Sequence, residues 1–110
     1  MTERDIDLTP PEPVAQAAEK GLELCRKFDR GGTKAGVARA RDLTNRVRLS
    51  ENAINRMVTY FRRHELDRRG GNFGNDEDPS AGYVAWLLWG GDEGRDWAET
   101  MADRIERGAV

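Results

Sequence analysis

Residues 34–66, KAGVARARDLTNRVRLSENAINRMVTYFRRHEL, hold the pattern that decides the fold class. Apolar residues recur three and four positions apart in this stretch, which gathers them on one face of an α-helix. Ser50 interrupts the pattern, and a serine oxygen can accept a backbone N–H from the first turn of the helix that follows. The stretch therefore predicts two helices, over about residues 34–46 and 51–66, joined by a short link.

The same periodicity continues on both sides of this stretch. It predicts helices over about residues 12–30 and 79–90, and a last helix that begins with Asp92 as its N-cap. The Gly31-Gly32 pair is expected to end the first of these helices, because glycine reaches the left-handed conformation without a Cβ penalty. Short alternation of apolar and polar residues is absent, so no strand is expected. The predicted fold is all-α, a compact domain of four or five helices.

The chain of 110 residues fits one domain. Residues 1–13 carry three prolines and several acids without an apolar stripe, so they are expected to form a flexible acidic arm. Residues 14–110 are expected to form the single helical domain. No apolar run approaches the roughly 20 residues of a membrane span, and the N-terminus is too polar for a signal peptide. A cytoplasmic protein that makes no membrane contact is the expectation.

Charge is unevenly distributed along the chain. Residues 26–69 carry 13 Lys/Arg against 5 Asp/Glu, whereas residues 70–110 carry 3 against 9. A basic middle flanked by acidic ends predicts an anionic partner for the middle, or ends that fold against it. The pattern alone leaves both interpretations open.

The predicted helix pair also fits a helix-turn-helix template. Five positions of that motif are apolar because they pack the two helices across the turn, and all five are apolar here: Leu43, Val47, Leu49, Ile54 and Met57. Arg48 stands where the motif usually has glycine, and is expected in the left-handed region at some cost. A helical hairpin whose apolar seam happens to match the template is the alternative.

In the helix-turn-helix arrangement, residues 51–66 would form the recognition helix, which presents its N-terminal residues to base edges. Asparagine and arginine can make bidentate contacts to adenine and guanine, so Asn52, Asn55 and Arg56 are the expected base-contacting residues. The remaining arginines of the segment are expected at phosphates. They are Arg39, Arg41, Arg46, Arg48, Arg62 and Arg63.

Several blocks of the chain resemble a small helical module found in tailed-phage and prophage proteins, sometimes attached to head-morphogenesis proteins. They are GGT (31–33), GVARAR (36–41), LS (49–50), RM (56–57), YF (60–61), RHE (63–65), PSAGY (79–83), AWLLWGGD (85–92) and WA (97–98). The likeness covers about residues 14–98. It implies a phage or prophage setting but no particular chemistry, and it supplies no site residues.

Isolated features of the sequence do not suggest catalysis, a metal or a cofactor. His64, the single histidine, lies at a helix end and lacks the orienting partner of a catalytic pair. Cys25 lies on an apolar stripe, so it is expected in the core. The cluster at residues 76–78 lacks the ligand spacing of a calcium loop, and is expected to cap the following helix and to solvate the loop. The glycine-rich run at residues 70–74 lacks a phosphate-binding lysine.

Two functions from different classes follow. The first is a phage- or prophage-type, non-enzymatic DNA-binding module that uses residues 34–66. The alternative is a protein-interaction or virion-assembly module with no nucleic-acid contact, in which the basic face binds an acidic partner. Tryptophans often anchor interfaces, but in so small a domain the expectation is that they form the core: Trp86, Trp89 and Trp97.

Overall fold

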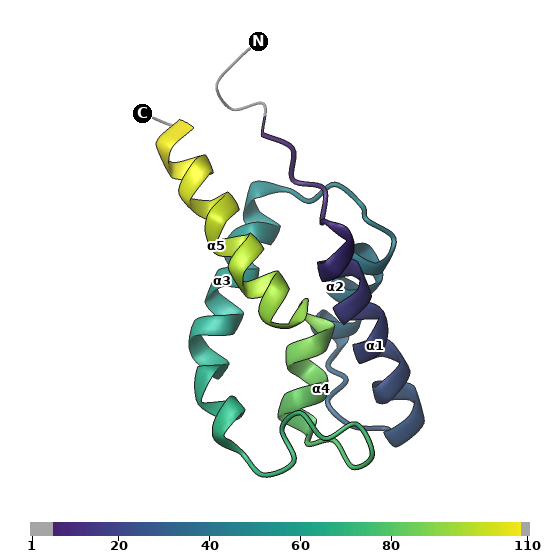
Figure 1. Ribbon diagram of the computed structural model, residues 1–110. Helices are drawn as coiled ribbons and strands as arrows, with labels where there is room; N and C mark the ends of the chain where they lie inside the picture. The colour runs from purple at the N-terminus through teal and green to yellow at the C-terminus, as the bar shows by residue number, and fades with distance from the viewer. Residues whose placement is uncertain (1–5, 109–110) are drawn as a thin grey trace.

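Five α-helices follow one another along residues 6–108, the part of the chain that the computed structural model describes (Figure 1). No strand occurs within residues 6–108, so the all-α prediction is confirmed. A short 3-10 segment, η1, follows the third helix. The elements are α1 (Glu12–Phe28), α2 (Lys34–Thr44), α3 (Glu51–His64), η1 (Glu65–Arg69), α4 (Ala81–Leu88) and α5 (Gly91–Gly108).

Side-chain caps begin three of the helices. Thr33, Ser50 and Ser80 each accept a backbone N–H from the first turn, at 3.0 Å in each case. The expected cap at Asp92 is wrong, because α5 already begins at Gly91. The Asp92 carboxylate instead accepts a hydrogen bond of 2.8 Å from the indole N–H of Trp86.

The core surrounds α4, which is apolar on nearly every side. Trp86, Val84 and Leu88 of this helix are almost fully buried. Helices α1 and α2 pack together on one side of α4, and α3 packs against α5 on the other. Burying these large side chains stabilises the fold by about 2 kcal/mol each. Helices α1 and α5 also pack directly on each other, so α4 and the α1–α5 contact together hold the two helix pairs against one another.

The N-terminal segment differs from the expected flexible arm. Leu8 is only 5% exposed, and its carbonyl accepts a hydrogen bond from the backbone N–H of Leu49 at 3.0 Å. Arg46 donates to the carbonyl of Pro10 at 2.8 Å, and Arg48 donates to that of Ile6 at 3.2 Å. From residue 6 onward the predicted arm is packed on the domain, since proline-rich backbone can be held by partners far along the chain. Residues 1–5 lie outside the described residues.

Helices α2 and α3 do not form the packed pair that the helix-turn-helix template requires. No Cα atom of α2 lies within 8 Å of a Cα atom of α3, although both helices lie wholly in the described range. Val47, one of the five template positions, is 45% exposed instead of buried. The left-handed residue of the link is Arg46 (φ 51°), and not Arg48. The template matched because four of its five residues are buried, but α2 packs against α1 and α4, whereas α3 packs mainly against α5.

The acidic loop before α4 is tied to α1. Asp76 accepts a hydrogen bond from the Tyr83 hydroxyl at 2.6 Å and pairs with Lys20 at 2.8 Å. Asp78 pairs with Arg30 at 2.7 Å. The expectation that this cluster caps α4 is therefore wrong, since the Ser80 oxygen is the cap. Of these two contacts, only the Asp78–Arg30 pair joins an acidic end to the basic middle of the chain, since Lys20 lies outside residues 26–69.

Candidate binding groove

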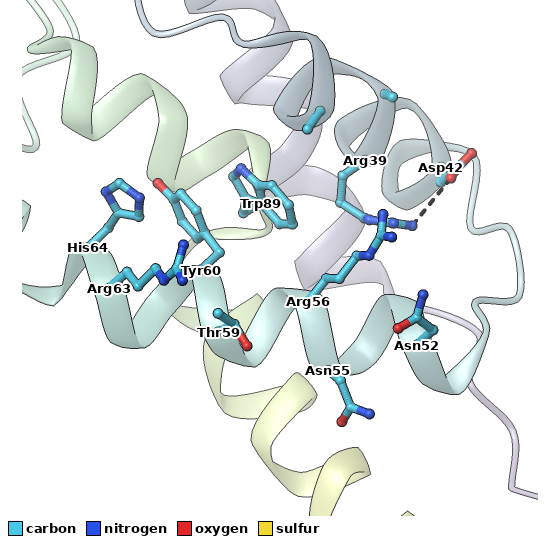
Figure 2. A pocket seen from close by; sticks show the side chains of 12 residues that line it. Arg39, Asp42, Asn52, Asn55, Arg56, Thr59, Tyr60, Arg63, His64 and Trp89 are labelled. Carbon is cyan, nitrogen blue, oxygen red and sulfur yellow. Dashed lines mark hydrogen bonds and ion pairs between the residues drawn. The ribbon is translucent and has the colours of Figure 1, made fainter.

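An open groove runs between α2 and α3, where the predicted helix pair fails to close. Its volume is about 540 Å³. Figure 2 shows the side chains that reach into it from the two helices and from the end of α4. The lining residues are Ala35, Ala38, Arg39, Asp42, Asn52, Asn55, Arg56, Thr59, Tyr60, Arg63, His64 and Trp89.

A stack of three rings holds one end of the groove. The Tyr60 ring lies parallel to the Trp89 ring, with 4.6 Å between centroids and an interplanar angle of 7°. Its other face stacks on His64 at 4.5 Å. Both faces of Tyr60 are therefore occupied within the protein, which leaves ring edges and not open ring faces for a ligand to contact. His64 also lies 3.0 Å from the Asp67 carboxylate, an orienting partner that the sequence did not suggest, and this contact fixes its ring at the end of α3.

The walls of the groove are basic and partly apolar. Arg39 from α2 and Arg56 and Arg63 from α3 contribute three positive charges. Of the described residues that line the groove, only Asp42 is acidic. Exposed Ala35 and Ala38 have no side chain beyond Cβ, so a ligand can approach the backbone of α2 closely.

The structure brings together five of the nine residues predicted to bind DNA. One face of α3 carries Asn52, Arg56 and Arg63, because Arg56 follows Asn52 by four residues and Arg63 follows Arg56 by seven. Asn55 lies at the rim of the groove, where it points away from Arg39 in Figure 2. Arg39 faces them from α2. These five residues therefore gather around one groove, as expected for residues that bind one partner.

The other four predicted residues lie elsewhere. Arg41 lines a cleft between α1 and α2 beside Cys25, which is half-buried there. Arg62 lies between α3 and α5, next to acidic residues of α5 such as Glu99. The remaining two, Arg46 and Arg48, donate to the N-terminal carbonyls described above. Because these arginines point to different sides of the molecule, they do not extend the groove into one phosphate-binding surface.

Sequence reasoning missed the aromatic part of the site. Trp86 is in the core as predicted, but Trp89 is half-buried and lines the groove beside Tyr60. Tyr60 was not singled out at all. The one available signal was its spacing from Arg56 and Arg63, four and three residues away, which places all three residues on one side of a helix.

Burial also perturbs Tyr60. Desolvation, and to a lesser extent the charge of Asp67, raises the pKa of the Tyr60 hydroxyl well above its ordinary value. Its oxygen is buried without a hydrogen-bond partner within the described residues. Tyr60 is therefore a neutral, structural part of the groove at physiological pH.

Among residues 6–108, no group of three or more His, Cys, Asp or Glu side chains is arranged to hold a metal ion. The helices of that range also include none that is long and apolar enough to cross a membrane.

Comparisons of the chain with protein-family models, with curated proteins and with solved structures find no match. The resemblance to a phage module, and the cytoplasmic location expected with it, therefore stay predictions.

Proposed function

We propose that this protein is a non-enzymatic binding module that holds an acidic segment of a partner protein in the groove between α2 and α3. The observation that carries the proposal is the convergence of Arg39, Arg56 and Arg63 on one open groove with an apolar lining. Arginine is enriched at protein interfaces because it combines a charge with a broad, weakly hydrated surface. Such a groove suits a segment that has carboxylates on one side and apolar side chains on the other.

Shape favours a protein segment over duplex DNA. A recognition helix must project from its protein to enter the major groove. Here α3 forms one wall of a concavity, with α2 as the opposite wall (Figure 2). The arginines needed for phosphates on both sides of a duplex point to different faces of the molecule. A phage or prophage assembly protein is the setting that the sequence resemblance suggests for such a module.

A labelled acidic peptide tests the proposal directly. The probe is an amphipathic helical peptide with glutamates on one face and leucines beside them, and its control replaces each glutamate with glutamine. We expect the acidic peptide to bind and the control peptide to bind at least tenfold more weakly, a difference of about 1.4 kcal/mol. Binding should weaken as salt is raised, since these charges are exposed.

Charge reversal locates the site. Arg56→Glu/Arg63→Glu should abolish binding of the acidic peptide. The matched control Arg26→Glu/Arg41→Glu makes the same change in net charge on the α1–α2 side and should retain it. Equal loss in both variants would mean that only net charge matters, and the proposal would then be wrong.

Duplex DNA is the second candidate, and the observation that favours it is the shared face of Asn52, Arg56 and Arg63. A short duplex titrated in the same assay separates the two functions. Binding of the duplex with a steep salt dependence, lost in Arg56→Glu/Arg63→Glu, would favour DNA. The protein partner would be favoured if the peptide binds tightly while the duplex binds weakly, and if the two charge-reversal variants weaken duplex binding equally.

A further inference from the structure

Two arginines face each other across the groove with little negative charge between them. Arg39 reaches in from α2 and Arg56 from α3, and Figure 2 shows their side chains extending toward one another. The only ion pair of Arg39 among the described residues is with Asp42, at a long 3.4 Å. Within the same range, Arg56 has no carboxylate within 4.0 Å. Like charges that line the same groove repel each other, and an anion between them would relieve that repulsion.

Arg39 is the less satisfied of the two residues. Its side chain is only 16% exposed, and its Nε atom is buried without a hydrogen-bond acceptor within the described residues. A guanidinium has five N–H donors and no acceptor, so a largely desolvated arginine needs several oxygen atoms around it. Leaving such donors unpaired is costly, and charged donors cost more than neutral ones. An oxyanion that enters the groove would supply acceptors to the guanidinium N–H groups of Arg39 that face it.

Asn52 adds a third donor group. It precedes Arg56 by one helical turn and lines the same groove. Its side-chain amide can donate to an oxyanion without adding charge. The site would then be built from both walls, with a planar guanidinium fork on each side and an amide at the edge.

We propose that Arg39, Arg56 and Asn52 form a subsite for a single carboxylate, supplied by an aspartate or glutamate side chain of the partner. The subsite rests on the proposed function, because it assigns the anchoring contact within the same groove. Asp42 occupies part of it in the unbound protein by its long contact with Arg39. Removing the Asp42 charge should therefore strengthen binding of an anion.

The arginine side-chain Nε–Hε signals of ¹⁵N-labelled protein report on this subsite. The probes are sodium acetate and sodium phosphate, each compared with sodium chloride at matched ionic strength. We expect acetate to shift the signals of Arg39 and Arg56 saturably, whereas chloride leaves them in place. Asp42→Asn should bind acetate several-fold more tightly. Arg39→Lys and Arg56→Lys should bind it at least tenfold more weakly, because lysine keeps the charge but lacks the fork.

A control and two contrary results complete the experiment. Arg41→Lys, in the cleft between α1 and α2, should leave acetate binding unchanged. Shifts that are spread over all arginines, or that are equal in acetate and chloride, would overturn the subsite. Phosphate binding at Arg39 and Arg56 without any acetate effect would overturn the choice of a carboxylate.

The peptide assay separates this inference from the function on which it rests. If the acidic peptide binds and depends on Arg56 and Arg63, while Asp42→Asn and Arg39→Lys change nothing, the function stands and the subsite is wrong. If acetate shifts Arg39 and Arg56 but the peptide does not bind, the subsite stands and the proposed partner is wrong.

Discussion

A Cβ atom at Gly21 would lie 2.6 Å from the backbone nitrogen of Leu88, because α1 and α4 cross with their backbones almost in contact. The adjacent carbonyl carbon of Leu87 would lie 2.9 Å from the same Cβ. Both neighbours are backbone atoms of a buried helix, so neither can move aside as a flexible side chain would. Gly21 therefore sets the distance between α1 and the central helix.

Gly21→Ala should destabilise the fold despite the better helix propensity of alanine. The propensity gain is about 1 kcal/mol, whereas overpacking a rigid contact costs about 1–3 kcal/mol and a backbone clash lies at the upper end of this range. We expect a net loss of about 2 kcal/mol in the free energy of unfolding, measured by urea denaturation. Gly71→Ala is the control, since a Cβ there meets nothing within 4 Å and should change the free energy of unfolding by less than about 0.5 kcal/mol.

Leu8→Ala tests whether the N-terminal segment belongs to the domain. Leu8 is 5% exposed and packs in the core, so truncation should lower the free energy of unfolding by about 2–3 kcal/mol. Leu66→Ala makes the same chemical change at a residue that is 70% exposed and should have almost no effect. Equal stability of the two variants in thermal denaturation would show that the segment behaves as the flexible arm that the sequence suggested.

Asp76→Asn should loosen the loop before α4. The Lys20 ammonium, and then the Tyr83 hydroxyl, lower the pKa of the Asp76 carboxyl below its ordinary value. The charged form therefore stabilises the fold above about pH 4, and this contribution is lost as the pH falls through the lowered pKa. Because Asp76 and Lys20 are about half exposed, the global effect should stay below about 1 kcal/mol. Faster proteolysis at residues 70–79 is the expected signal.

The control for the loop is Glu77→Gln. The Glu77 side chain is exposed and makes no ion pair within residues 6–108, so its neutralisation changes the charge of the loop without touching the Lys20–Asp76 contact. We expect its proteolysis rate to match that of the unaltered protein. A rate as high as that of Asp76→Asn would contradict the role assigned to this contact.

Tyr60→Phe should reduce the decrease in the free energy of unfolding that occurs at high pH. Burial raises the pKa of Tyr60 in the folded state, while the unfolded value stays near 10.0. The folded state therefore loses stability as the pH rises above about 10, because the unfolded chain ionises there while the buried hydroxyl resists ionisation. Lys20 and Tyr83 also have raised pKa values, so the comparison is the difference between the two proteins. At pH 7 the substitution should be neutral or stabilising by up to about 1 kcal/mol, since it removes an unpartnered hydroxyl.

The predictions that the structure confirms depend on interactions between residues close together in the sequence. Ser50 caps α3 as predicted, because a cap needs only the first turn of its own helix. The all-α class follows from spacing within each helix. The gathering of Asn52, Arg56 and Arg63 on one face also follows from helical periodicity alone.

Contacts between segments far apart in the sequence account for the predictions that were wrong. The Arg46 and Arg48 side chains were expected at phosphates, but their partners are carbonyls of the N-terminal segment about 40 residues earlier. Spacing showed that Leu43 and Ile54 would be buried, yet it could not show that their helices, α2 and α3, would pack on different neighbours.

The sequence by itself determined the helices, most of their caps and the basic side of α3, because each depends on residues at most a few positions apart. Only the tertiary structure decided that α2 and α3 stand apart, with Trp89 and Tyr60 between them and Arg39 opposite Arg56. The physical reason is that each helix packs mainly on a different neighbour: α2 packs against α1 and α4, and α3 packs mainly against α5. The groove lies between α2 and α3 because each of these helices packs on other helices instead of on the other.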